Sequence, residues 1–304
     1  DRAAFVQAFS SSHRYIFDYL VEEVLRRQPA HIQQFLLQTS ILDRLSGSLC
    51  EAVIGRPAQT GAEPSSDSQS LLEYLERNNL FVVPLDDDRC WYRYHHLFAD
   101  LLRQRLERAT PASVSTLHQR ASEWYQGQGF IVEAIEHAIS SGDYHRSGHL
   151  VQRLGWSIFA RGELTTILGW IEALPNEVVS AHPELRVLQA WAMAKSGRLD
   201  HVERCLGAVN AGDLRGEVAA IRAYVAGVRG DVAQAVELAQ LALDLLPQEN
   251  AGLRAIVKQN LGTAYHWSGD PIAASNYLVE AVKLSQAAGE THQSLTALAI
   301  LGRT

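Results

Sequence analysis

Residues 260–284 read NLGTAYHWSGDPIAASNYLVEAVKL, and this stretch decides the fold of the longer part of the chain. It has two helical segments joined at Gly269. Small residues lie seven positions before that glycine (Gly262) and five and twelve positions after it (Ala274 and Ala281). Small side chains at these positions let two antiparallel helices approach closely and let the pair stack on the next pair. The stretch therefore predicts a helical hairpin that belongs to a stack.

The same pattern recurs upstream. Turn glycines follow one another at intervals of 33, 35, 33 and 39 residues, and a small residue lies seven positions before each. The glycines are Gly129, Gly162, Gly197, Gly230 and Gly269, and the small residues are Ser122, Gly155, Ala190, Ala223 and Gly262. A period near 34 is typical of a helical-hairpin solenoid, and residues 260–284 resemble a tetratricopeptide repeat. Residues 111–304 are therefore predicted to form a tetratricopeptide-like superhelix of undetermined repeat number.

The first part of the chain has a different order. Helical patterns over residues 31–45, 46–55 and 70–80 precede two β-rich runs, LFVVPL (80–85) and CWYRYH (90–95), separated by DDDR. Helices followed by one hairpin are typical of a winged-helix domain, here predicted over 29–110. Residues 14–28 predict an amphipathic helix, so 1–28 are assigned to a linker helix, and residues 56–70 to a loop. The predicted fold class is mainly α: a winged helix with one β-hairpin, followed by a tetratricopeptide-like α-α superhelix.

Composition and motifs limit the function. A net charge of −7 argues against nucleic-acid binding by the chain itself, and no apolar run is long enough to cross a bilayer. The three cysteines are far apart, as in proteins of the reducing cytoplasm. None of the three lysines follows a glycine, so the chain has no P-loop, and no hydrolase or metalloprotease motif is present. We therefore expect no catalytic site, no metal site and no resident cofactor, and hence no enzyme.

Three segments carry a family resemblance: FSSSHRYIFDYLVEEVLRRQP (9–29), FLLQTSILDRLSGSLCEAV (35–53) and YRYHHLFADLLRQRL (92–106). They resemble the large ATP-binding LuxR-type transcription regulators of the maltose-activator type, which belong to the STAND class of signalling ATPases. The resemblance implies a cytoplasmic regulator whose P-loop ATPase and helix-turn-helix lie outside this chain. It also implies that ATP or ADP, DNA and RNA polymerase bind those other parts. A ligand-dependent homo-oligomer is expected of the full-length protein.

The resemblance also assigns a role to His95. In related STAND proteins a Met-His-Asp motif after the wing places its histidine on the β-phosphate of ADP. Here Tyr94-His95-His96 occupies that place, so His95 matches the histidine while Tyr94 and His96 differ from the motif. The alternative is a structural histidine. A metal pair is disfavoured, because neighbouring residues of a strand point to opposite faces.

The concave face of the superhelix is the expected sensor surface. Counting six residues back from three turn glycines gives Trp191, Tyr224 and Thr263, and similar counting adds Glu184, Lys195, Glu217, Gln259, His266 and Trp267. Aromatic rings among polar groups suit a sugar, a peptide or an aromatic metabolite. The alternative for these residues is packing between repeats. The predicted function is a sensor for a small-molecule inducer or protein partner within a transcription activator, and the alternative is a constitutive protein-interaction scaffold.

Overall fold

The computed structural model describes residues 25–55, 68–207, 209, 212, 214–289 and 291–302. Contacts divide the chain into two compact units, Asp1–Asp143 (unit 1) and Tyr144–Thr304 (unit 2). The linker helix predicted over 1–28 and the loop predicted over 56–70 fall largely outside the described residues. The predicted fold class is confirmed, because helices dominate the described residues and these include one two-stranded antiparallel sheet.

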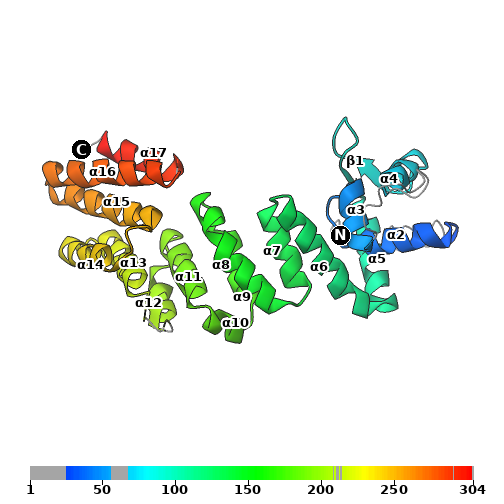
Figure 1. Cartoon of the computed structure of the whole chain (residues 1–304), viewed down its shortest axis with the longest axis horizontal. Helices are drawn as coiled ribbons and strands as arrows, with labels where there is room; N and C mark the ends of the chain where they lie inside the picture. The colour runs from blue at the N-terminus through cyan, green and yellow to red at the C-terminus, as the bar shows by residue number, and fades with distance from the viewer. Residues whose placement is uncertain are drawn as a thin grey trace, which may run out of the picture. The chain divides into compact units, whose positions relative to one another are not determined.

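Unit 1 has the element order of a winged helix followed by a helical hairpin (Figure 1). Its elements are α2 (Ala30–Thr39), α3 (Gly47–Ile54), α4 (Ser68–Arg77), β1 (Val82–Pro84), β2 (Tyr92–Tyr94), α5 (His96–Ala109), α6 (Pro111–Gly127) and α7 (Ile131–Ser140). The helix predicted over residues 46–55 is observed as α3, one residue shorter at each end. The Ser46 side chain accepts a hydrogen bond from the N–H of Leu49, and Gly55 ends the helix in the left-handed conformation.

The β-hairpin is held to the helices by Tyr92 and Tyr94. Val82 pairs with Tyr94 in the antiparallel register of β1 and β2, and Tyr92 forms a bridge with Leu45 outside the sheet. The buried Tyr94 hydroxyl lies 2.7 Å from Oγ1 of Thr39 in α2, and burial raises the pKa of Tyr94. A hydroxyl buried among apolar groups requires such a partner, so this contact fixes β2 against α2.

The α6–α7 hairpin packs on the winged helix. Trp91, next to β2, contacts Trp124 of α6 edge to face at 6.3 Å and Phe130 at 6.0 Å. Arg44 forms an ion pair with Glu133 of α7 and lies over the Trp91 ring. The core of unit 1 therefore continues past α5 into α6 and α7. The domain limits inferred from sequence, 29–110 and 111–304, stay predictions.

Unit 2 is a series of helices in which successive long helices pack as antiparallel neighbours (Figure 1). The short α10 lies between α9 and α11 in the chain, and α9 packs directly against α11. The helices are α8 (Tyr144–Ala160), α9 (Leu164–Ala173), α10 (Asn176–Ala181), α11 (Pro183–Lys195), α12 (Leu199–Gly207), α13 (Arg215–Val228), α14 (Val232–Leu245), α15 (Ala251–Ser268), α16 (Pro271–Ala287) and α17 (Thr291–Leu301).

The predicted turn glycines are confirmed as hairpin turns. All five have φ between 79° and 85°, a left-handed conformation that only glycine adopts without steric cost. At Gly269 the N–H donates to His266, and the N–H of the next residue, Asp270, donates to Tyr265. The other four turns show the same pair of hydrogen bonds. This pattern is the Schellman motif, which satisfies the last carbonyls of the first helix and reverses the chain.

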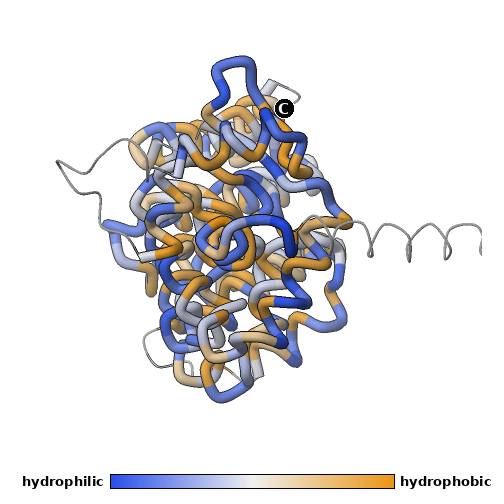
Figure 2. Tube along the Cα trace, turned by 90° about the vertical axis from the view of Figure 1, so that its right-hand side faces the viewer, coloured by the Kyte–Doolittle hydropathy of each residue, from blue (hydrophilic) through white to orange (hydrophobic). Residues whose placement is uncertain are grey.

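The small residues before the turns lie where helices touch. A Cβ built on Gly262 would lie 2.6 Å from Cγ of Leu278 and 3.1 Å from the Ala274 carbonyl oxygen, both in α16. Hydrophobic and hydrophilic segments alternate along the helices (Figure 2), as expected for helices that each bury one face. In the described part of the chain, no helix is both long enough and apolar enough to traverse a lipid bilayer.

We expect Gly262→Ala to lower the free energy of unfolding by about 1–3 kcal/mol, because the new methyl group overlaps Leu278 and a backbone oxygen. The matched control is Gly169→Ala in α9, where an added Cβ meets no atom within 4 Å. This control should leave stability unchanged or raise it through helix propensity. Urea unfolding followed by circular dichroism compares the two variants, and equal midpoints would contradict the close-approach argument.

Candidate functional site

His95 lies where β2 passes into α5. Its N–H donates to the Phe81 carbonyl at 2.8 Å, and its carbonyl accepts from Phe98 and Ala99 in the first turn of α5. Its side chain is exposed. The backbone of His95 is therefore fixed by both the wing and the helix, while its imidazole is accessible to a ligand.

His96 is exposed as well, and its ring centroid lies 4.5 Å from that of His95. The expectation that the two side chains point to opposite faces was wrong, because β2 ends at Tyr94 and His96 already belongs to α5. The described residues contain no group of three or more His, Cys, Asp or Glu side chains arranged for a metal ion.

Unit 2 contains a cavity of about 990 Å³. Its wall is built from the ends and inner faces of several helices and combines apolar with charged side chains. The lining includes Trp156, Phe159, Arg161, Glu184, Val187, Lys195, Glu217, Glu249, Asn250, Leu253, Ile256, Gln259 and Thr296. A cavity of this size and composition is typical of small-molecule sites.

Two of the predicted ligand-binding residues, Lys195 and Gln259, line this cavity, and so do Glu184 and Glu217. Lys195 is the last residue of α11, and its ammonium lies 4.3 Å from the centre of the Tyr224 ring. Burial lowers the pKa of Lys195 from 10.5 to about 8, because desolvation disfavours the charged form.

Trp191 and Tyr224 do not line the cavity. Trp191 is fully buried in the core of unit 2, with Phe159 of α8 at 6.4 Å on one side and Tyr224 of α13 at 5.8 Å on the other. Helices on both sides of α11 cover the position six residues before the turn. Tyr224 is half-buried, and its ring contacts the Lys195 ammonium.

The other three predicted residues also lie off the cavity wall. The Thr263 hydroxyl donates to the Gln259 carbonyl of its own helix. His266 contacts the neighbouring Trp267 ring, and Trp267 is 77% exposed at the end of α15. Ligand binding by any of the residues selected from sequence stays a prediction.

The counting missed Trp156, Phe159 and Arg161, which bring the end of α8 to the cavity. The signal for Trp156 was present, since it lies six residues before Gly162, as Trp191 does before Gly197. Phe159 lies beside Trp156, with ring centroids 5.3 Å apart. Together they form an aromatic wall.

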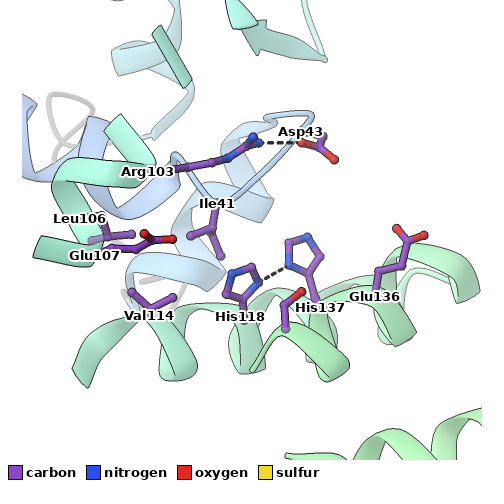
Figure 3. A pocket seen from close by; sticks show the side chains of 10 residues that line it. Ile41, Asp43, Arg103, Leu106, Glu107, Val114, His118, Glu136 and His137 are labelled. Atoms are coloured by element: carbon purple, nitrogen blue, oxygen red, sulfur yellow. Dashed lines mark hydrogen bonds and ion pairs between the residues drawn. The ribbon is translucent and has the colours of Figure 1, made fainter. Parts of the chain in front are cut away.

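Unit 1 has a smaller cavity of about 290 Å³ between α5, α6 and α7 (Figure 3). At its wall His118 of α6 and His137 of α7 face each other, with their Nδ1 atoms 2.8 Å apart. One ring donates its N–H and the other accepts. Arg103 of α5 donates to Asp43 across the same cavity. No sequence motif pointed to this histidine pair.

Burial lowers the pKa of both histidines from 6.5 to about 4. The charge of Arg103 acts in the same direction on both, and His118 does so on His137, whereas Asp43 partly opposes the shift of His137. Burial and the nearby carboxylates of Glu133 and Asp43 raise the pKa of Glu136 on the same wall. At neutral pH the pair is therefore an uncharged hydrogen bond that joins α6 to α7.

Both parts of the chain match known families. The MalT winged helix domain matches residues 21–114, and the MalT-like TPR region matches residues 216–304. The HTH-type transcriptional regulator MalT of Cronobacter sakazakii is 34% identical over 268 residues, which are 86% of this chain. The chain is MalT-like. The predicted family resemblance is confirmed.

The MalT-like chain spans 28% of the length of that relative. It is also similar to the crystal structure of a STAND protein with a tetratricopeptide repeat sensor from Pyrococcus horikoshii, with 16% identity and a TM-score of 0.43. That similarity covers 94% of this chain and 49% of the other. The MalT winged-helix match includes β2, His95 and α5.

The histidine pair gives the MalT-like chain a defined acid sensitivity. Since the folded-state pKa values lie below 6.5, the unfolded chain binds more protons as the pH falls from 6.5 towards 4. The free energy of unfolding should be highest above pH 6.5 and should fall by on the order of 2–4 kcal/mol between pH 6.5 and 4. Urea unfolding at pH 7, 6, 5 and 4 measures this loss.

The double substitution His118→Gln with His137→Gln replaces the pair by amides that hydrogen-bond without titrating. It should flatten the pH dependence of the free energy of unfolding between pH 6.5 and 4. The control is His201→Gln, because His201 is exposed in unit 2 and should leave the wild-type profile intact. A double variant that is as acid-sensitive as the wild type would show that the histidine pair does not cause the loss of stability at low pH.

Proposed function

We propose that this chain is the regulatory and sensing segment of a signal-dependent, ATP-controlled transcription activator, and that it is not itself an enzyme. The winged helix couples the sensor to the nucleotide state of an ATP-binding segment. ATP or ADP, DNA and RNA polymerase bind segments outside this chain. The complete protein acts in the cytoplasm and forms a homo-oligomer when its ligand is bound.

The match to MalT in both parts of the chain carries this proposal. The cavity of unit 2 supports the sensing role, because it combines an aromatic wall with a few charged groups that fix orientation. It is lined by side chains from several helices of the repeat array, so a ligand would contact several repeats at once.

His95 is the proposed link to the nucleotide. An imidazole N–H that donates to a phosphate oxygen is a charge-assisted hydrogen bond and can hold a domain to a bound nucleotide. The His95 backbone is fixed by hydrogen bonds to Phe81 and to the first turn of α5. A contact at its ring would therefore act on the wing and on α5 together.

The alternative is a constitutive protein-interaction scaffold. Trp267 and Ile272, at the turn between α15 and α16, are 77% and 76% exposed. Contiguous exposed apolar surface marks protein-binding sites. A partner held there would need no inducer.

A thermal-shift screen separates the two functions. Neutral sugars, nucleotides and aromatic metabolites are tested on the chain. A ligand at one hundred times its Kd should stabilise the folded state by about 2.7 kcal/mol. Trp156→Ala, which removes part of the cavity wall, should abolish the shift, whereas Trp267→Ala should retain it. A shift lost only in Trp267→Ala would favour the scaffold.

In a regulator that joins this chain to an ATP-binding segment, His95→Ala should weaken ADP binding roughly tenfold or more and raise basal promoter activity. Loss of one hydrogen bond to a charged group gives this magnitude. Isothermal titration with ADP and a promoter reporter measure the two effects.

His96→Ala is the matched control, since His96 is exposed beside His95 and is the first residue of α5. It should leave ADP affinity and basal activity close to wild type. Equal ADP affinity in His95→Ala and wild type would overturn the nucleotide contact without affecting the proposed sensing role of unit 2.

A further inference from the structure

The Lys195 ammonium at the cavity wall has no anionic partner among the residues that the structure describes. Its described contact is with the face of the Tyr224 ring. By contrast, Lys258, which also lies near a tyrosine ring, forms an ion pair with Glu280. A partly buried ammonium without hydrogen-bond acceptors is costly to desolvate, and an anion entering the cavity would offset that cost.

The carboxylates of the cavity wall occupy other places. Glu184 lies in the first turn of α11, eleven residues before Lys195, so about 16 Å of helix separates them. Glu217 lies in the first turn of α13, and Glu249 precedes the N-cap of α15. Helix N-termini favour negative charge, so the positions of these three carboxylates are explained without an interaction with Lys195. The exposed Arg161 is a second cation on the wall.

Apolar surface completes the site. Trp156 and Phe159 form the aromatic wall at the end of α8, and Leu253 and Ile256 line the cavity from α15. The Tyr224 ring holds the ammonium by a cation–π contact, which fixes its place while leaving its N–H donors available. The cavity thus presents aromatic and aliphatic walls together with the partly buried Lys195 ammonium, which forms no ion pair with a described residue.

We propose that the cavity of unit 2 binds an aromatic or otherwise apolar small molecule that carries a carboxylate, sulfonate or phosphate group. The Lys195 ammonium receives the anionic group, and Trp156 and Phe159 contact the apolar body. This inference rests on the proposed sensing function and names the chemical class of its ligand.

The probe is 8-anilinonaphthalene-1-sulfonate, and its neutral counterpart is N-phenyl-1-naphthylamine, which has the same rings without the sulfonate. Fluorescence titration of the wild-type chain should give saturable binding of the sulfonate at one site. Lys195→Met should weaken sulfonate binding roughly ten- to a hundredfold, the range for one hydrogen bond between charged groups. It should leave binding of the neutral probe within about twofold, because the side-chain volume is kept.

Lys283→Met is the control, because Lys283 is exposed and is not part of the cavity wall. It should bind both probes like the wild type. Trp156→Ala should weaken the binding of both probes. Circular dichroism and the melting temperature check that each variant is folded. Equal sulfonate affinity in wild type and Lys195→Met, or no saturable binding in the wild type, would overturn the proposal.

A pH series on the wild-type chain gives a second readout that needs no variant. Sulfonate affinity should fall as the pH rises from 7 to 10 and the ammonium loses its proton, while affinity for the neutral probe stays constant. The other charged groups on the wall are Arg161, Glu184, Glu217 and Glu249, and Tyr224 faces Lys195. Burial raises the pKa of Tyr224 above the ordinary tyrosine value of 10, so its ionisation lies above the pH range of the series. Parallel profiles for the two probes would contradict the role of Lys195.

The outcomes also separate this inference from the sensing function. A neutral inducer that depends on Trp156 but not on Lys195 would overturn the anion site and leave the sensor intact. If probe binding depends on Lys195 but cavity ligands do not change promoter activity, the sensing function is overturned and the anion site stands.

Discussion

A glycine in the left-handed conformation closes each helical hairpin, and the tetratricopeptide-like array depends on that backbone conformation. At φ near 80° the two N–H groups that end the turn reach the last carbonyls of the preceding helix. Any other L-residue would place its Cβ against the following carbonyl oxygen, at a cost of roughly 1–2 kcal/mol. Because the turn recurs, each second helix returns antiparallel along the first. The small residue seven positions earlier, such as Gly262, then meets its neighbour at close range.

Side chains with the same offset from a turn glycine nevertheless differ in exposure. Trp191, six residues before its turn, has α8 on one side and α13 on the other, so its indole is enclosed. Trp156 has the same offset from Gly162 but contributes to the cavity wall. Lys195 lies only two residues before its turn, at the end of α11, where the ammonium reaches past the core onto the Tyr224 ring. Offset from the turn sets the direction of a side chain, and the neighbouring helices decide its exposure.

The same distinction separates what the sequence predicted from what it did not. Local signals were sufficient for the turn glycines, the helix over residues 46–55 and the β-hairpin, because each depends on residues close in the chain. The cavity was predicted in part: Lys195 and Gln259 line it, whereas the burial of Trp191 depends on helices far away in sequence. His118 and His137 are 19 residues apart and fit no motif, so only tertiary packing reveals their contact.

The two units contain two different solutions to the burial of a titratable group. His118 and His137 become neutral, and the hydrogen bond between their Nδ1 atoms joins α6 to α7. Lys195 remains largely protonated at pH 7 with a pKa of about 8. A ring face compensates an ammonium only in part, since cation–π contacts contribute about 0.5–2 kcal/mol and accept no hydrogen bond. Nδ1 of each histidine is therefore used in a contact between two helices, whereas the lysine keeps its N–H donors available at a cavity wall. That difference distinguishes a structural contact from a receptor site in two groups that are both shifted by burial.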